Sequence, residues 1–253
     1  MYFFVISLKK SLVYRWSALF SIIGSVLAIA INVMLWRYLY GHQQDMLAYM
    51  TKYTIIANII SMLYPRGISG KIGNRVYDGS FIIDLMRPVN FFAMVWQQEL
   101  ADICSRFILR GVAVILVYAP LLIQNAGYYN IPQVCIAVVF GHVLFLLIYS
   151  LLGFSSFILI EIWPFGRFLD DTIRLLGGGF IPLAILPNGL RFIAEILPFK
   201  YVYSFPLKLL FNDLGERENL LNFAVLGIWI IIFSLLNLLM YRFALRKITV
   251  QGG

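Results

Sequence analysis

Charged residues are scarce in this sequence, and histidine and cysteine are scarcer still. Asp, Glu, Lys and Arg make up 13% of the 253 residues, about half the share in an ordinary soluble domain, while 61% are hydrophobic. This composition excludes a soluble protein and leaves no stretch polar enough for a nucleic-acid-binding domain. His42 and His142 lack the H-x-x-x-H spacing of a metal pair, and Cys104 and Cys135 fall in apolar stretches that favour inert thiols. We therefore expect no metal site, no disulfide and no nucleic-acid partner.

Long apolar stretches are what the sequence does contain. A run of about 20 mostly apolar residues is long enough to cross the bilayer core as a helix. Six such runs predict crossings at residues 17–36, 46–63, 103–123, 133–152, 168–186 and 221–241. We find no internal repeat or linker and treat residues 1–253 as one domain. The predicted fold class is an all-α polytopic membrane protein with six transmembrane helices.

The positions of lysine and arginine predict the orientation of these helices. The chain carries a net charge of +8, and its basic residues gather before the first run, after the second and after the last, at Lys9, Lys10, Arg15, Arg66, Lys71, Arg75, Arg87, Arg242, Arg246 and Lys247. Loop 124–132 has no charge. Because basic flanks stay in the cytoplasm and meet anionic lipid, both termini are predicted to be cytoplasmic. Four basic residues on the assigned outer side run against this pattern, at Arg191, Lys200, Lys208 and Arg217.

Two segments are too short or too polar to span. Residues 1–16 alternate an apolar and a basic face, which predicts an amphipathic helix at the inner membrane surface or an extension of the first span. Between residues 176 and 213, four prolines cut an apolar run into limbs of about ten residues, each covering about 15 Å as helix. Residues 187–213 are therefore predicted to form a re-entrant outer helical hairpin before the last span. The alternative is an ordinary span kinked by proline.

Polar side chains within or beside the predicted spans are candidates for a transport pathway. Intramembrane polar groups normally face other helices or water. Asn32 and Asn58 lie within the first two spans, and Glu99, Asp102, Arg106 and Arg110 form a stripe at the start of the third. The stripe is interpreted equally well as a solvated interfacial face or as a pore entry or subunit contact. The possible pathway residues are Asn32, Asn58, Arg106 and Arg110.

Enzyme signatures are few. The string GISG, residues 67–70, matches the G-x-S-G of rhomboid-type intramembrane serine proteases, which leaves a Ser69–His142 dyad as an alternative function. Ser69 falls among basic loop residues, however, and not at the buried start of a helix. The string SGKIG, residues 69–73, lacks both the earlier glycine and the Ser or Thr of a phosphate-binding loop. We expect a chain that is not an enzyme and binds no ATP or other cofactor itself.

The segment RVYDGSFIIDLMRPVN, residues 75–90, carries a more specific signal. Its Gly79 precedes an apolar run that ends in Leu85, Arg87 and Pro88. Together with the six runs and the proline-rich outer segment, it resembles the permease subunits of type-2 ABC exporters, in an uncharacterised subfamily with a Leu-x-Arg-Pro pattern. The likeness covers essentially the whole chain. A channel or scaffold without an ATPase remains a further alternative.

The resemblance implies partners and roles that composition does not show. It implies two separate cytosolic ABC ATPase subunits that hold ATP and magnesium, a second permease chain, identical or related, and a place in the bacterial plasma membrane. The cytoplasmic loop 64–102 would couple to the ATPase through Lys71, Asn74, Arg75, Asp78, Gly79, Asp84, Arg87 and Pro88. The outer hairpin would close a gate, with Pro182, Pro187, Pro198, Phe199 and Pro206. Without the resemblance, the loop is an ordinary basic loop.

Overall fold

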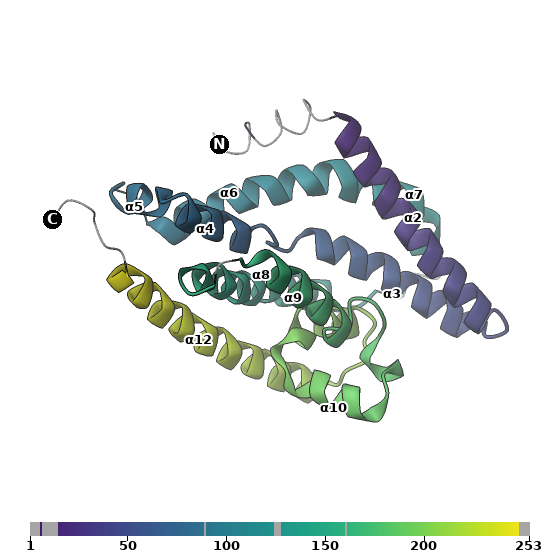
Figure 1. The fold of residues 1–253 in the computed structure, drawn as a ribbon. Helices are drawn as coiled ribbons and strands as arrows, with labels where there is room; N and C mark the ends of the chain where they lie inside the picture. Colours follow the sequence, from purple (N-terminus) through teal and green to yellow (C-terminus); the bar gives the residue numbers. More distant parts are fainter. Residues whose placement is uncertain (1–5, 7–14, 89, 124–127, 160, 248–253) are drawn as a thin grey trace.

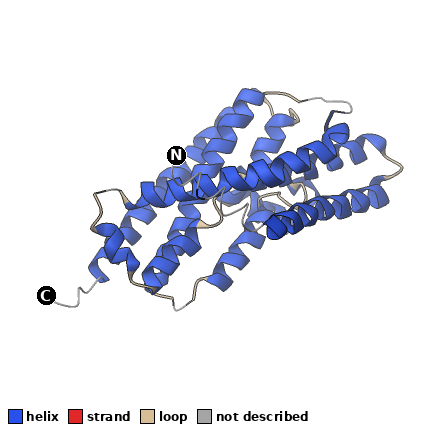
Figure 2. Cartoon of the chain, turned by 90° about the horizontal axis from the view of Figure 1, so that it is seen from above, coloured by secondary structure: helices blue, strands red, loops and turns tan. Residues whose placement is uncertain are grey.

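Helices make up all the regular structure in the part of the chain that the computed structural model describes, which is residue 6 and residues 15–88, 90–123, 128–159 and 161–247 (Figures 1 and 2). The all-α prediction is confirmed. The elements are α2 (Arg15–Tyr40), α3 (Gln44–Met62), α4 (Ile68–Tyr77), α5 (Ser80–Leu85), α6 (Phe91–Arg106), the π-helical turn η1 (Phe107–Gly111), α7 (Val112–Ile123), α8 (Ile131–Phe154), η2 (Ser155–Phe157), α9 (Trp163–Leu176), η3 (Leu183–Ile185), α10 (Asn188–Ile196), η4 (Pro198–Tyr201), α11 (Ser204–Leu210) and α12 (Glu216–Lys247). Most of the interfacial helix predicted for residues 1–16 lies outside the described residues.

Four helices are long and apolar enough to cross a membrane, among the residues described. They run over Trp16–Tyr40, Phe91–Ile123, Ile131–Phe157 and Glu216–Arg246 and contain the first, third, fourth and sixth predicted spans. Many of their large apolar side chains point outward, such as Phe20, Met34 and Leu220, each at least 69% exposed. Apolar side chains on the outside of a long helix suit contact with lipid.

The third span begins earlier than the sequence suggested. Asn90 caps α6, where its side-chain oxygen accepts a hydrogen bond from the Ala93 N–H at 3.1 Å. Helix α6 then continues through η1 into α7 without a break. The polar residues between Gln97 and Arg106 hid this start, because they lower the hydropathy of that window. The stripe Glu99–Arg106 therefore lies on a helix that begins two turns before it.

The two remaining predicted spans differ from the long helices. Helix α3 matches the second span in position, but Met50 to Ile55 are all buried within the protein. The prediction of one helix over residues 168–186 is wrong, because α9 ends at Leu176. Three glycines follow, and Gly178 takes a positive φ of 83° that side-chain-bearing residues rarely adopt. Helix α9 therefore measures only about 21 Å, and the count of six crossings stays a prediction.

Prolines divide the segment after α9 into short helices, as the sequence predicted. Pro187 directly precedes α10, and Pro198 opens η4, positions where the missing proline N–H costs no helical hydrogen bond. Every residue from 201 to 207 is buried. The Ser204 N–H donates to the Gly177 carbonyl at 2.9 Å. The limbs thus fold back on α9. Their depth in the membrane stays a prediction.

Helix α8 forms the centre of the structure. It contacts α4, α11 and α12. Aromatic rings continue this core: Phe145 of α8 stacks on Tyr64 at 5.1 Å and on Tyr149 at 4.3 Å between ring centroids, and Tyr64 meets Tyr203 edge-on at 5.5 Å. In Figure 1, α4 and α5 lie at one end of the molecule and α10 lies toward the other. Helix α8 therefore joins the α4 end to the proline-rich segment.

Candidate functional site

The α4–α5 element, residues 68–85, turns sharply at Gly79. Gly79 has a φ of 74°, and the adjacent Asp78 side chain accepts the Ser80 N–H at 2.9 Å. Hydrogen bonds from the Ser80 side chain and backbone lower the pKa of Asp78. Helix α5 ends at Leu85, before Pro88. Gly79 therefore makes the turn between the two helices, whereas Gly70 and Gly73 lie inside α4, and α5 stops three residues before Pro88.

An ion pair closes this element from inside. Arg75 Nε on α4 lies 2.8 Å from Asp84 Oδ2 on α5, and Arg75 also donates to Gln98 Oε1 of α6 at 2.6 Å. The other oxygen of Asp84 lies 3.4 Å from Arg87. Because Asp84 is buried, neither it nor Arg75 faces outward as an element of a docking surface would. Their position indicates that they hold α4 and α5 together.

Small residues let α4 lie directly on α8. A side chain at Gly153 of α8 would come within 2.8 Å of Ile72 Cβ, and one at Gly73 of α4 would meet the Ile162 side chain. Ile72 and Gly73 are buried. The close approach leaves no gap between the helices, so α4 and α8 are expected to move as one body.

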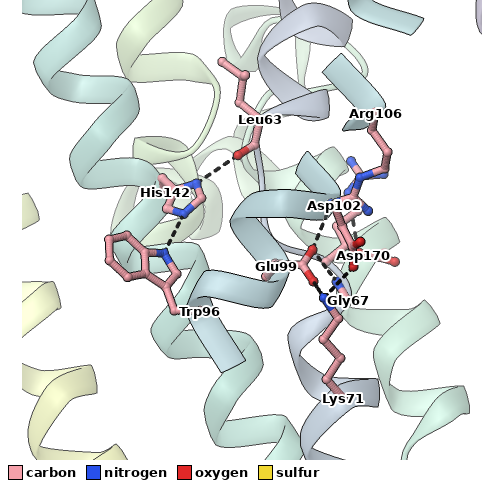
Figure 3. A network of polar contacts seen from close by, with 10 residues as sticks. Leu63, Gly67, Lys71, Trp96, Glu99, Asp102, Arg106, His142 and Asp170 are labelled. Carbon is pink, nitrogen blue, oxygen red and sulfur yellow. Dashed lines mark hydrogen bonds and ion pairs between the residues drawn. The ribbon is translucent and has the colours of Figure 1, made fainter. Parts of the chain in front are cut away.

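A buried carboxylate fixes α4 to α6. Glu99 has a side chain only 1% exposed and lies 2.8 Å from Lys71 Nζ; its other oxygen accepts from Arg106 at 2.8 Å and from the Gly67 N–H at 3.2 Å (Figure 3). Lys71 also pairs with Asp102 at 2.6 Å. A buried charge is stable only with such partners. Lys71, expected to contact another subunit, instead belongs to this internal network, and Glu99 is the buried residue at its centre.

His142 forms a second link, between α8, α6 and the end of α3. Its Nδ1 lies 2.9 Å from the Leu63 carbonyl and its Nε2 lies 3.3 Å from the Trp96 indole nitrogen (Figure 3). Because a carbonyl accepts and an indole N–H donates, the neutral ring with its proton on Nδ1 satisfies both contacts. The expectation that Ser69 lies in a loop is wrong, because Ser69 is buried in the first turn of α4. Neither ring nitrogen of His142 contacts it, however. The structure therefore gives no support to the Ser69–His142 protease dyad.

The outward face of the α4–α5 element holds the other predicted coupling residues. Asn74, Asp78, Gly79, Arg87 and Pro88 are all exposed. Tyr77, which the sequence did not single out, lies beside them with 48% of its surface exposed. The structure thus separates the predicted set into an inner group that holds the element and an outer group that is exposed.

A cavity of about 370 Å³ opens behind this network, between α2, α3, the α6–η1 junction and α9. We call it the arginine cavity, because Arg66, Arg106, Arg110 and Arg174 all line it. Of the predicted pathway residues, Asn58, Arg106 and Arg110 also lie on its wall. Asn32 does not; its amide donates to the Ala28 carbonyl of its own helix at 2.8 Å. Helix α2 contributes serines and Gly24 to the wall.

The proline-rich segment carries a smaller charged cluster. Glu195 of α10 lies 3.0 Å from Lys200 Nζ and 3.5 Å from Lys208 Nζ. Of the predicted gate residues, Pro182, Pro198 and Pro206 are buried, Phe199 is half-buried and Pro187 is exposed. Lys200 and Lys208, two of the basic residues that ran against the predicted orientation, are thus paired with one carboxylate.

Comparison with protein families identifies what kind of membrane protein this is. The family described as ABC-2 family transporter protein matches residues 19–252. The chain belongs to the ABC-2 transporter family. Neither the curated proteins nor the solved structures contain a match. The predicted resemblance to a type-2 ABC permease is confirmed at the level of the family, over almost the whole chain.

Two residues of this ABC-2 family protein belong to the site although the sequence did not point to them. In the sequence, Arg66 counted only as one of the basic residues after the second predicted span, and Arg174 carried no functional expectation. The fold of the ABC-2 chain brings both to the wall that Arg106 and Arg110 share. In the sequence, Arg66 and Arg174 are two separate basic residues, and neither spacing nor periodicity indicates that they lie close together.

Proposed function

We propose that this chain is the permease subunit of an ATP-driven exporter. Two permeases, identical or related, form the pathway, and two separate cytosolic ATPase subunits supply the energy. Membership of the ABC-2 family and the four apolar helices support the membrane part of this proposal. The α4–α5 element is cytoplasmic in this arrangement, as are both termini, and its outer face contacts the ATPase.

The observation that carries the coupling role is the rigid attachment of the α4–α5 element. An element that transmits force must present polar contacts on one side and resist deformation on the other. Asn74, Tyr77 and Asp78 offer the contacts, while the Arg75–Asp84 pair closes the element. When the ATPase pair closes around ATP, it displaces the α4–α5 element, and the element moves without changing its shape.

Two connections carry the motion onward. Ile72 packs on Gly153 of α8, and Lys71 and Gly67 bind Glu99 of α6. Helix α8 reaches α11 and α12, and α6 continues through η1 into α7. A displacement of the α4–α5 element therefore tilts α8 and the continuous helix α6–η1–α7 together. Packed interiors transmit such shifts because they have little free volume. The proline-rich segment closes the outer end of the pathway until the tilt reaches it through α8.

The test is ATPase stimulation in the reconstituted complex. Permease and ATPase are purified together, and the ATP turnover of the complex is compared with that of the ATPase alone. We expect Asp78→Arg to lower the stimulated rate by about fivefold or more, within the range of typical coupling energies. Asp45→Arg changes an exposed acidic residue in the first turn of α3, at the other end of the molecule, and should leave the rate unchanged (Figure 1).

Two results would contradict the proposal. If Asp78→Arg couples normally, the outer face of the α4–α5 element is not the docking surface. If the solubilised chain never recovers an ATPase subunit, the protein is a channel or scaffold and not an ATP-driven permease. The melting temperature of each variant separates lost coupling from lost folding, since both substituted side chains are exposed.

A further inference from the structure

We propose that the arginine cavity binds an anionic group of the phosphate or carboxylate class. Arg66, Arg106, Arg110 and Arg174 line the cavity, and the described residues on its wall include no aspartate or glutamate. Guanidinium groups present paired N–H donors that match the oxygens of a phosphate or carboxylate. The inference rests on the cavity alone and does not require an ATPase.

The charges on the cavity wall are only partly neutralised from within the protein. Arg106 is paired with Glu99, and Arg66 Nε lies 3.9 Å from Asp170, too far for a hydrogen bond. That Nε is buried and has no acceptor among the described residues. A buried donor left unpaired costs free energy that a bound oxygen would recover.

Arg110 and Arg174 lack any ion pair with a described carboxylate. Arg174 instead lies over the Phe180 ring, with its guanidinium carbon 4.2 Å from the ring centroid. Arg110 sits on the long apolar helix of residues 91–123. Charged groups within membrane helices are costly unless they are paired or mark a functional path. An anion between these arginines neutralises the remaining charge.

The shape of the cavity agrees with a bound group of moderate size. Its volume of about 370 Å³ falls within the range of small-molecule sites, about 300–1,000 Å³. Gly24 of α2 lies on its wall, and a Cβ there would meet no atom within 4 Å, so the space beside α2 is open. The hydroxyls of Ser25 and Ser61 donate to backbone carbonyls, which leaves the arginines as the main donors.

The π-helical turn contributes to this arrangement. Arg110 lies in η1, and Gly111 follows it where a side chain would come within 2.8 Å of the Phe107 ring. A π-turn carries an extra residue per turn and often occurs at functional sites. Here it presents Arg106 and Arg110 to the same cavity.

Two sources supply such an anion: the headgroup of a membrane lipid, or a small soluble anion. Both share the chemistry of paired oxygens carrying negative charge. The full-length chain, purified without ATPase, is placed in phosphatidylcholine nanodiscs for two measurements. One counts phosphatidylglycerol retained by the protein in native mass spectrometry as its fraction in the disc is raised. The other follows the melting temperature as inorganic phosphate replaces chloride at constant ionic strength.

We expect saturable binding in at least one arm, weakened about tenfold by Arg110→Gln, which removes one charged donor pair. Gly24→Leu should have a similar effect, because it fills the cavity while every charge remains. The matched controls are Arg37→Gln, an exposed arginine at the end of α2, and Gly227→Leu, an equally open glycine on α12. Both should bind as the wild type does.

Retention of phosphatidylglycerol alone identifies a lipid headgroup site, and stabilisation by phosphate alone identifies a soluble anion site. Equal affinity of the wild type and both cavity variants, or no anion-dependent signal in either arm, would overturn the inference. If Arg110→Gln does not fold, Gly24→Leu decides the result. Since no ATPase is present, failure here leaves the proposed coupling untouched, and failure of the coupling leaves this site untouched.

Discussion

Arg75 Nε lies 2.8 Å from Asp84 Oδ2, and this pair joins α4 to α5 across the turn at Gly79. The two side chains are 16% and 8% exposed, so water screens them little. An ion pair in such a place stabilises one relative orientation of the two short helices. The shape of the α4–α5 element therefore depends on this pair as well as on the turn at Gly79.

Removal of one partner from this pair should destabilise the protein strongly. Asp84→Ala leaves the mostly buried Arg75 guanidinium without a carboxylate beside it, with Gln98 Oε1 and the Lys71 carbonyl as its hydrogen-bond acceptors. Breaking a buried pair costs about 3–5 kcal/mol, and we expect the lower end because Arg75 keeps some exposure. Unfolding in mixed detergent micelles measures the loss. Asp78→Ala, at the exposed turn, should change little, and an equal loss there would contradict the internal role of Asp84.

The turn itself should be sensitive to any side chain. Gly79 has a φ of 74°, so Gly79→Ala forces an alanine into the left-handed region at a cost of about 1 kcal/mol or slightly more. No atom lies within 4 Å of the added Cβ, so the cost is conformational and not steric. Gly70→Ala is the matched control, equally open but inside α4, where alanine is the better helix former. The two variants should shift unfolding in opposite directions.

The contact between α4 and α8 can be tested at Gly153. A Cβ there would approach Ile72 Cβ to 2.8 Å, so Gly153→Ala must push α4 away from α8. Overpacking of this kind typically costs about 1–3 kcal/mol. Gly166→Ala, whose Cβ would meet only Leu152 at an ordinary 3.8 Å, should not destabilise. If α4 and α8 transmit motion, Gly153→Ala also lowers ATPase stimulation, whereas Gly166→Ala does not.

Local features of the chain were predictable, and long-range ones were not. Gly79 and Pro88 act through their own backbone restrictions, so the turn and the helix stop could be predicted from the sequence alone. The prolines of the outer segment likewise revealed its short limbs. The end of α9 is a similar local effect, but the apolar residues after the three glycines concealed it. A hydropathy window scores side chains and takes no account of the backbone conformation at the glycines, which ends the helix.

The inner and outer sides of the α4–α5 element could not be told apart from the sequence. Arg75 and Lys71 look like ordinary basic loop residues, and only the packing of α4 on α8 and α6 turns them inward. Glu99 shows the same limit, because its partners come from α4, α6 and the loop before α4. The arginine cavity depends on four elements that meet only in the fold. Such sites follow from tertiary structure, which periodicity does not encode.

The charged cluster of the proline-rich segment should make stability depend on pH. Burial raises the pKa of Glu195, but the hydrogen bond from Lys200 and the charge of Lys208 outweigh it, so the pKa is lowered overall. A carboxylate with a lowered folded-state pKa stabilises the protein above its unfolded pKa, which is about 4.3 for glutamate. The contribution is then lost as the pH falls through the lower folded value.

Glu195→Gln should therefore melt below the wild type at pH 7, and the difference should shrink as the pH falls below about 4. Melting temperatures between neutral and acidic pH, measured for both proteins in the same detergent, give the comparison. The control is Glu161→Gln, which changes an exposed glutamate that forms no ion pair with a described residue. A difference for Glu195→Gln that stays constant with pH would mean that the side chain acts through its shape and not its charge, because only the ionised form attracts the two lysines.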